Sequence, residues 1–223
     1  GTPIGRRTLD WATAVFTAVW GLLCTCLASA SRKSEVSLPA GVPFDRSRLS
    51  RASLTWRFAG GGGGHVAAPP AERLRTLRGG DFAVLAPPPA KNDQFGETFG
   101  AHPIWLPFEP GEPTNAAAAL AEVELAFPVA PGARRSVPLF CSAVDMTPIR
   151  HSEIDAVLRL LLLCIMGAAE AARYSVHSLR IACACALLAN GCSHAMIQAF
   201  CRWKTTQSIS TYARLDPVVY GAH

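Results

Sequence analysis

Residues 11–30 form a run of twenty positions without a charged side chain. A run of this length fits a membrane span, the apolar part of a secretory signal or a helix buried inside a protein. Two arginines precede the run, and Ala28-Ser29-Ala30 at its end resembles a signal cleavage site. Three threonines and a serine dilute it, however, and Asp10 lies at its entry. We therefore expect a buried helix over residues 8–30 and keep a membrane or secreted protein as an alternative.

The composition is that of a globular chain. Half of the 223 residues are hydrophobic and 17% are charged, which is too apolar for a disordered protein. The length predicts one domain that spans residues 1–223. The eight cysteines include no CxxC pair and no zinc-site spacing, so we interpret them as free, mostly buried thiols of a protein in a reducing compartment.

Charge is distributed unevenly along the chain. Residues 1–80 contain 11 Lys and Arg against 4 Asp and Glu, and residues 171–223 contain 5 against 1, whereas residues 81–170 contain 5 against 11. If the fold brings the two basic ends together, they form a cationic face suited to phosphate groups. Arginine outnumbers lysine 18 to 3, which limits any role that needs a lysine. The three lysines are Lys33, Lys91 and Lys204.

The remaining patterns predict a predominantly helical α+β fold, with a small antiparallel sheet or hairpin packed on a helical bundle. We expect strands at 53–58, 81–86 and 102–108, the last two joined as a hairpin across a proline-rich turn. Residues 60–64 are five glycines and predict a loop tip. Residues 134–140 indicate an extended segment. Further helices are expected at 71–77, 115–126, 151–166, 178–189, 193–202 and 207–215.

A short motif near the C-terminus carries the strongest chemical signal. His177 and Arg180 lie three residues apart at the start of an expected helix, so their side chains share a face. An imidazole and a planar guanidinium at a helix N-terminus suit a phosphate diester. Such a pair recurs by chance, but here Trp203 follows and Tyr212 comes nine residues after it.

Residues 174–214 resemble the catalytic domain of the tyrosine recombinases, the phage-integrase family. The resemblance rests on YSVHSLR, on a small-residue helix that ends in ALLANG, and on HAMIQAFCRWKTTQSISTYAR. In that family the nucleophilic tyrosine follows a His or Trp by nine residues. The family also needs an arginine far upstream with a glutamate three residues on, which Arg32 and Glu35 supply. Its lysine lies in a hairpin turn, where this chain has Lys91.

The resemblance implies strand exchange in DNA without a metal or another cofactor. Tyr212 would attack the scissile phosphate and form a 3′-phosphotyrosine with a free 5′-hydroxyl. Arg32 and Arg180 would hold the non-bridging oxygens, and Lys91 would protonate the leaving 5′-oxygen. His177 would hydrogen-bond the phosphate and assist proton transfer.

Other positions follow the family less closely or have supporting roles. Trp203 would donate its indole N–H to a phosphate oxygen and pack against the tyrosine helix. Glu35 would brace the first arginine or the His177 region. A small residue, usually glycine, is expected where Cys201 and Arg202 precede the tryptophan. Lys33 is a weaker candidate for the acid than the hairpin lysine, because adjacent residues at a helix end point apart.

The resemblance further implies double-stranded DNA as the partner, self-association into a synaptic tetramer on that DNA, and an intracellular location with DNA in a nucleus or nucleoid. No membrane is expected. The helical DNA-clamping domain that precedes the catalytic domain in this family is missing from the chain, since Arg32 comes too early. Type IB topoisomerases use similar residues, so simple relaxation of DNA is a further alternative. We rank it below recombination because the compact spacing resembles that of the integrases. A degenerate mobile-element protein that binds DNA without cutting it also stays open as an alternative.

Overall fold

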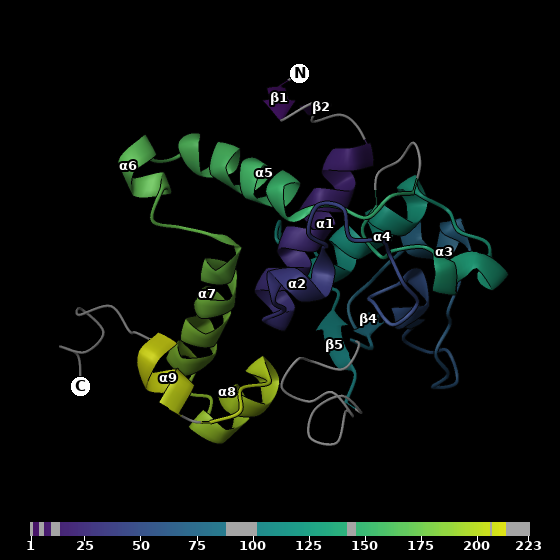
Figure 1. The fold of residues 1–223 in the computed structure, drawn as a ribbon. Helices are drawn as coiled ribbons and strands as arrows, with labels where there is room; N and C mark the ends of the chain where they lie inside the picture. The colour runs from purple at the N-terminus through teal and green to yellow at the C-terminus, as the bar shows by residue number, and fades with distance from the viewer. Residues whose placement is uncertain are drawn as a thin grey trace.

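Helix α1 (Ala14–Ser29) lies at the centre of the molecule (Figure 1). The computed structural model describes residues 2–4, 7–9, 14–87, 102–141, 146–205 and 207–212. Buried residues occur all round α1, as expected for a helix without a polar face. Its hydroxyl groups are also satisfied: Thr25 Oγ1 donates to the carbonyl of Gly21, and Ser29 Oγ to the carbonyl of Thr25. Among the described residues, no helix combines the length and hydropathy needed to cross a bilayer.

The expected helix over residues 8–30 is shorter than predicted. Strand β1 (Thr2–Ile4) pairs antiparallel with β2 (Arg7–Leu9), so Thr8 and Leu9 belong to a hairpin. Their extended backbone pairs with Pro3 and Thr2, which excludes these two positions from the helix.

Helix α4 (Ala116–Ala126) packs closely against α1. The approach depends on Gly21, because a Cβ atom there would lie 2.7 Å from Cγ2 of Val123. Asn115 caps α4 by accepting a hydrogen bond from the backbone N–H of Ala118 at 2.8 Å. The alanine-rich helix predicted from the sequence is therefore confirmed, with its N-terminal cap.

One antiparallel sheet of three strands contacts α4 through β4 and β5. Its order is β3 (Leu54–Arg57), β4 (Phe82–Leu85) and β5 (Ile104–Pro107). Trp56 lies opposite Ala83, and Ala83 opposite Leu106, so these three buried residues face the core together. This confirms the three expected strands and the pairing of β4 with β5. The tip of that hairpin lies outside the described residues.

A buried ionic triad joins the sheet region to α4. Arg51 opens the short 3-10 helix η1 (Arg51–Ser53), and Arg134 lies in a second one, η2 (Pro131–Ser136). Both arginines bind Glu124: Arg51 Nη1 lies 3.1 Å from Oε2, and Arg134 Nη1 donates to Oε2 at 3.0 Å. The extended segment predicted at 134–140 is wrong for its first three residues, because the chain turns there to bring Arg134 to the buried carboxylate.

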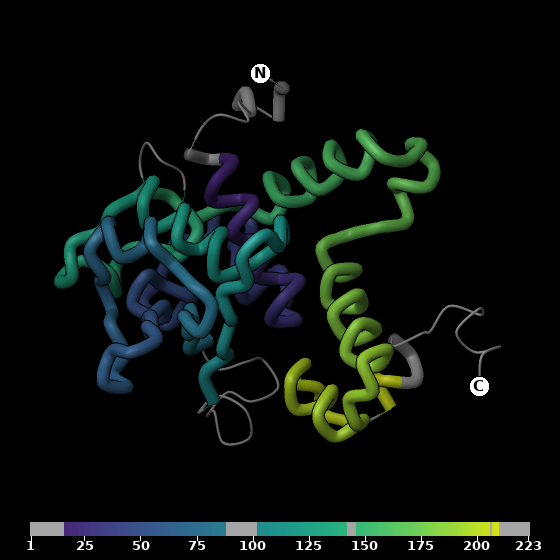
Figure 2. Tube along the Cα trace, turned by 180° about the vertical axis from the view of Figure 1, so that it is seen from behind, coloured from purple at the N-terminus to yellow at the C-terminus, as the bar shows by residue number. Residues whose placement is uncertain are grey.

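The C-terminal half forms an arc of helices that curves back beside α1 (Figures 1 and 2). Helix α7 contacts α1, and α8 and α9 both pack against α7. These helices enclose a second, smaller core that contains Ala30, Cys183, Trp203 and Ile209. The arc consists of α5 (His151–Leu163), α6 (Ala168–Ala171), α7 (Val176–Ala189), α8 (His194–Cys201) and α9 (Gln207–Tyr212).

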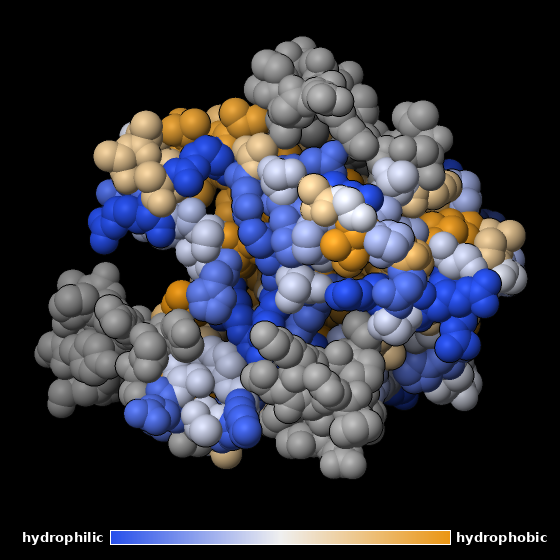
Figure 3. Space-filling view, viewed as in Figure 1, coloured by the Kyte–Doolittle hydropathy of each residue, from blue (hydrophilic) through white to orange (hydrophobic). Residues whose placement is uncertain are grey.

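The predicted helices of this half are confirmed over the described residues, with small shifts at their ends. Residues 213–215, the end of the last predicted helix, lie outside the described residues. Ser193 caps α8 as expected, because its Oγ accepts from the backbone N–H of Met196 at 3.3 Å. Helix α5 ends three residues earlier than predicted, and beyond its end Ile165 is 77% exposed. Hydrophobic and hydrophilic side chains both lie on the surface of this α5–α6 arm, whereas hydrophilic ones dominate the middle of the same face (Figure 3). The remaining helices are α2 (Lys33–Val36) and α3 (Ala71–Arg75).

The cysteines are all within the described residues, and all eight are free. Five are buried, and Cys164 is exposed. Burial raises the pKa of both Cys24 and Cys183 to about 12, so these thiols stay protonated at neutral pH.

Candidate active site

Arg32 lies at the turn between α1 and α2. Ala30 has a positive φ of 49°, and the chain reverses there before α2 begins. Glu35 then holds Arg32 from both sides: its Oε2 accepts the backbone N–H of Arg32 at 2.8 Å, and its Oε1 accepts from Arg32 Nη1 at 3.0 Å. The Arg32 side chain remains 26% exposed, so a ligand can reach it. The expected bracing role of Glu35 therefore has a direct structural basis.

Arg180 points from α7 to the same turn. Its two Nη atoms donate to the carbonyl oxygens of Ala30 and Cys201, which joins the end of α1 to the end of α8. The side chain is 2% exposed, and its guanidinium carbon lies 5.6 Å from the ring centroid of Trp203. Burial, and next the positive charge of Arg32, lower the pKa of Arg180 to about 10, so it is still charged at neutral pH.

His177 lies one turn before Arg180 on α7 and is exposed. Partial burial lowers the pKa of its imidazole below the usual 6.5, and the positive charges of Arg180 and Arg32 lower it further. The neutral form is therefore favoured near pH 7. In this form one ring nitrogen can accept a proton while the other donates a hydrogen bond.

Trp203 and the tyrosine helix share the second core. Trp203 is 6% exposed and belongs to the same hydrophobic cluster as Ile209 of α9. The side chain of Gln198 donates to the carbonyl oxygens of Trp203 and Lys204, both at 3.3 Å, which holds the link between α8 and α9. Tyr212 is the last residue of α9, and its side chain lies outside the described residues.

The lysines differ in their surroundings. Lys91 lies outside the described residues, in the connection between β4 and β5. One pocket is lined by Trp105 of β5 and Phe200 of α8, so this hairpin borders the helix that leads to Trp203. Lys33 is engaged elsewhere, because its Nζ donates to Asp155 Oδ2 of α5 at 2.9 Å. Its position is thus unfavourable for the acid role.

Arg202 is a member of the site that the sequence pattern did not assign. It follows α8 in the left-handed conformation, with φ 52° and ψ 47°, and its side chain is 6% exposed. Its Nη2 donates to Glu35 Oε2 at 2.9 Å and lies 3.5 Å from Ser31 Oγ. Its Nε and Nη1 have no hydrogen-bond partner among the described residues. The glycine expected near this position was the available signal, since glycine commonly occupies left-handed sites.

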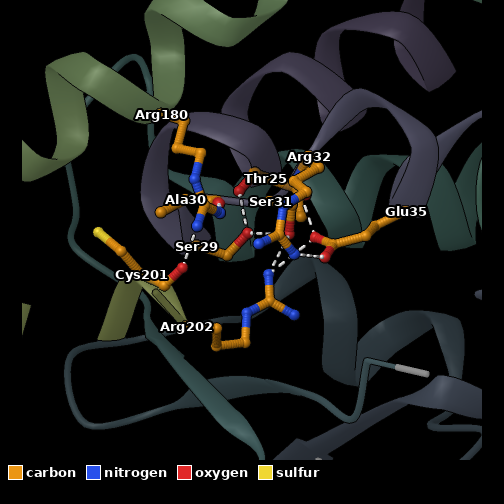
Figure 4. Close-up of polar contacts among 9 residues, drawn as sticks. All are labelled: Thr25, Ser29, Ala30, Ser31, Arg32, Glu35, Arg180, Cys201 and Arg202. Atoms are coloured by element: carbon orange, nitrogen blue, oxygen red, sulfur yellow. Dashed lines mark hydrogen bonds and ion pairs between the residues drawn. The ribbon is translucent and has the colours of Figure 1, made fainter. Parts of the chain in front are cut away.

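Arg32 and Arg202 both bind Glu35, and Arg180 lies close by at the carbonyl oxygens of Ala30 and Cys201 (Figure 4). We term these three arginines and Glu35 the arginine cluster. They come from the two basic ends of the chain, as Arg180 and Ala30 are 150 positions apart. Three guanidinium groups with one carboxylate leave an excess of positive charge. Such an excess, partly shielded from water, favours an anion.

The described residues contain no group of three or more His, Cys, Asp or Glu side chains that could hold a metal ion. A comparison with protein-family models found no match for the chain, and a comparison with curated proteins found none either.

Proposed function

We propose that this chain is the catalytic domain of a tyrosine-recombinase-like enzyme that cleaves and rejoins duplex DNA through a phosphotyrosine at Tyr212. One observation carries the proposal: Arg32 and Arg180, which the recombinase pattern pairs across the chain, meet beside His177 and Trp203. Arg32 is partly exposed, His177 is exposed, and both are near enough to interact electrostatically. Guanidinium and imidazole groups grouped in this way support the proposal, because both can donate hydrogen bonds to phosphate oxygens.

In the cleavage step the phenolic oxygen of Tyr212 attacks the phosphorus, and the bond from phosphorus to the 5′-oxygen breaks. The phenol proton passes to neutral His177, because an unassisted phenol with a pKa near 10 is a weak nucleophile. Lys91 gives a proton to the leaving 5′-oxygen. Rejoining reverses each transfer, with a 5′-hydroxyl displacing the tyrosine, so the link conserves the phosphodiester energy and needs no nucleotide.

Arg32 and Arg180 would both stabilise the transition state. A guanidinium has five N–H donors, and the hydrogen bonds of Arg180 to the carbonyl oxygens of Ala30 and Cys201 use two of them. Because the Arg180 side chain is 2% exposed, donation from its remaining N–H groups to a phosphate oxygen would require the surrounding side chains to move aside when DNA binds. Arg32, bound through Nη1 to Glu35, has further donors on its exposed side. Together they would neutralise the charge that develops on the non-bridging oxygens.

The proposal is tested by trapping the covalent link. The full chain is incubated in EDTA with a pool of short duplexes of randomised sequence, each nicked once so that cleavage releases a short strand and cannot be reversed. We expect a protein–DNA adduct that survives denaturing electrophoresis, with the protein on the 3′ end. An adduct that forms only when Mg²⁺ is added would contradict the metal-free mechanism. DNA binding without any adduct would instead support the non-cleaving mobile-element protein.

The lowered pKa of His177 predicts how the cleavage rate depends on pH. Since neutral His177 is the form that accepts the phenol proton, cleavage measured as kcat/KM should rise with pH through a midpoint below 6.5. This parameter reports the unliganded enzyme, in which burial and the neighbouring arginines lower the pKa. The rise should be lost in His177→Gln and kept in the control His194→Gln. A midpoint above 6.5, or a rise that persists in His177→Gln, would refute this role.

A further inference from the structure

Arg202 occupies a backbone conformation that most side chains avoid. Its φ of 52° lies in the left-handed region, which glycine adopts freely and an arginine adopts at a free-energy cost. The residue is also buried, with its guanidinium directed at Glu35 (Figure 4). Among the described residues, the contacts of Nη2 are the polar contacts that hold this charged side chain at a strained and buried position, because Nε and Nη1 have no hydrogen-bond partner there.

Those contacts lead directly to Arg32. The carboxylate of Glu35 receives three hydrogen bonds, from the backbone and Nη1 of Arg32 and from Nη2 of Arg202. Glu35 thus connects the end of α8 to the start of α2. Arg202 is followed in the chain by Trp203 and then by α9, the helix that carries Tyr212. The bonds of Arg202 and Arg32 to Glu35 therefore also connect α9 to Arg32.

We infer that Arg202 is a positioning residue that fixes Arg32 through Glu35 and so sets the first arginine against the helix that carries Tyr212. Without Arg202, one oxygen of Glu35 loses its partner from α8, and the carboxylate and Arg32 can move together. Misplacement of a catalytic donor by about 1 Å can cost up to about 100-fold in rate. This inference rests on the proposed function, which supplies the reaction whose rate is measured.

Arg202→Gly tests the role, because glycine suits the left-handed backbone and removes only the side chain. We expect its adduct-forming rate at saturating DNA to fall about 10- to 100-fold, with little change in the DNA concentration for half-saturation. Arg202→Lys, which keeps a positive charge near Glu35, should recover part of the rate. A rate for Arg202→Gly within about twofold of the unmodified protein would overturn the inference.

A second comparison separates positioning from a general loss of structure. If Arg202 acts through Arg32, Arg202→Gly should slow the residual reaction of Arg32→Ala by less than about twofold, because the group it positions is already absent. Independent losses that multiply in the double variant would overturn the positioning role and indicate direct contact of Arg202 with the phosphate.

The link itself can be measured without any reaction. Thermal unfolding of Arg202→Gly, Glu35→Gln and the double variant should show non-additive shifts of the melting temperature, since the two residues share one ion pair. Additive shifts would mean that the link is absent in solution, and the inference would fail. A chain that shows this coupling but forms no adduct would contradict the proposed function alone.

Discussion

Replacing Tyr212 with phenylalanine is expected to abolish the protein–DNA adduct completely while leaving DNA affinity nearly unchanged. The substitution removes the phenolic oxygen, which is the proposed nucleophile, and keeps the aromatic ring. Binding depends on the basic residues and the DNA backbone, which the substitution does not alter. Adduct formation is measured on denaturing gels and binding by a mobility shift at fixed salt.

Tyr174→Phe is the matched control for this experiment. Tyr174 is 41% exposed and lies just before α7, where its hydroxyl is 3.5 Å from Glu170. We expect this variant to form the adduct at close to the rate of the unmodified protein. Adducts that persist in Tyr212→Phe would show that another residue is the nucleophile, and loss in both variants would point to a non-specific effect.

Arg180→Ala should have the second-largest effect, because it disturbs both the fold and the chemistry. Two buried carbonyl oxygens, of Ala30 and Cys201, would lose their donors at about 1–3 kcal/mol each, so the free energy of unfolding should fall by about 2–6 kcal/mol. The loss of a donor to the transition state should slow cleavage by about 10²–10³-fold. Denaturant unfolding and single-turnover adduct formation measure the two effects separately.

Two further variants separate the effect on stability from the effect on cleavage. Arg32→Ala should show the loss of cleavage with a much smaller loss of stability, since its side chain is partly exposed. Arg173→Ala removes an arginine whose side chain is 75% exposed, and it should change neither quantity appreciably. If Arg180→Ala lowers stability but cleaves DNA at the normal rate when folded, Arg180 is a purely structural residue and the proposed phosphate clamp is wrong.

The sequence predicted those parts of the fold that local chemistry decides. Ser193 was expected to cap a helix because its side chain can accept a backbone N–H group, and the structure shows that contact. The alanine-rich helix was expected to begin at Asn115, and the structure adds that the Asn115 side chain caps it. The buried helix before Arg32 was expected from its lack of charge. Where distant partners decide, prediction failed: Arg134 follows a local pattern of extended chain, but Glu124 draws it into a 3-10 turn.

The same distinction applies to the site. The spacing of His177 and Arg180 is local, and a family pattern located Arg32 from the other end of the chain. Arg202 could not be placed in this way, because its partner Glu35 is 167 positions distant. Its left-handed backbone left one local signal, the small residue expected near this position. The sequence alone could not show whether the fold brings the two basic ends of the chain together. The hydrogen bond from Arg180 to the carbonyl of Ala30 shows that it does.

The central claim is that Tyr212 becomes covalently bound to DNA. The most direct measurement is to trap the adduct on nicked duplexes, digest both protein and DNA, and identify by mass spectrometry the residue that retains the nucleotide. The proposal predicts a nucleotide joined through its 3′-phosphate to Tyr212. A nucleotide on any other side chain, or a link through a 5′-phosphate, would contradict it.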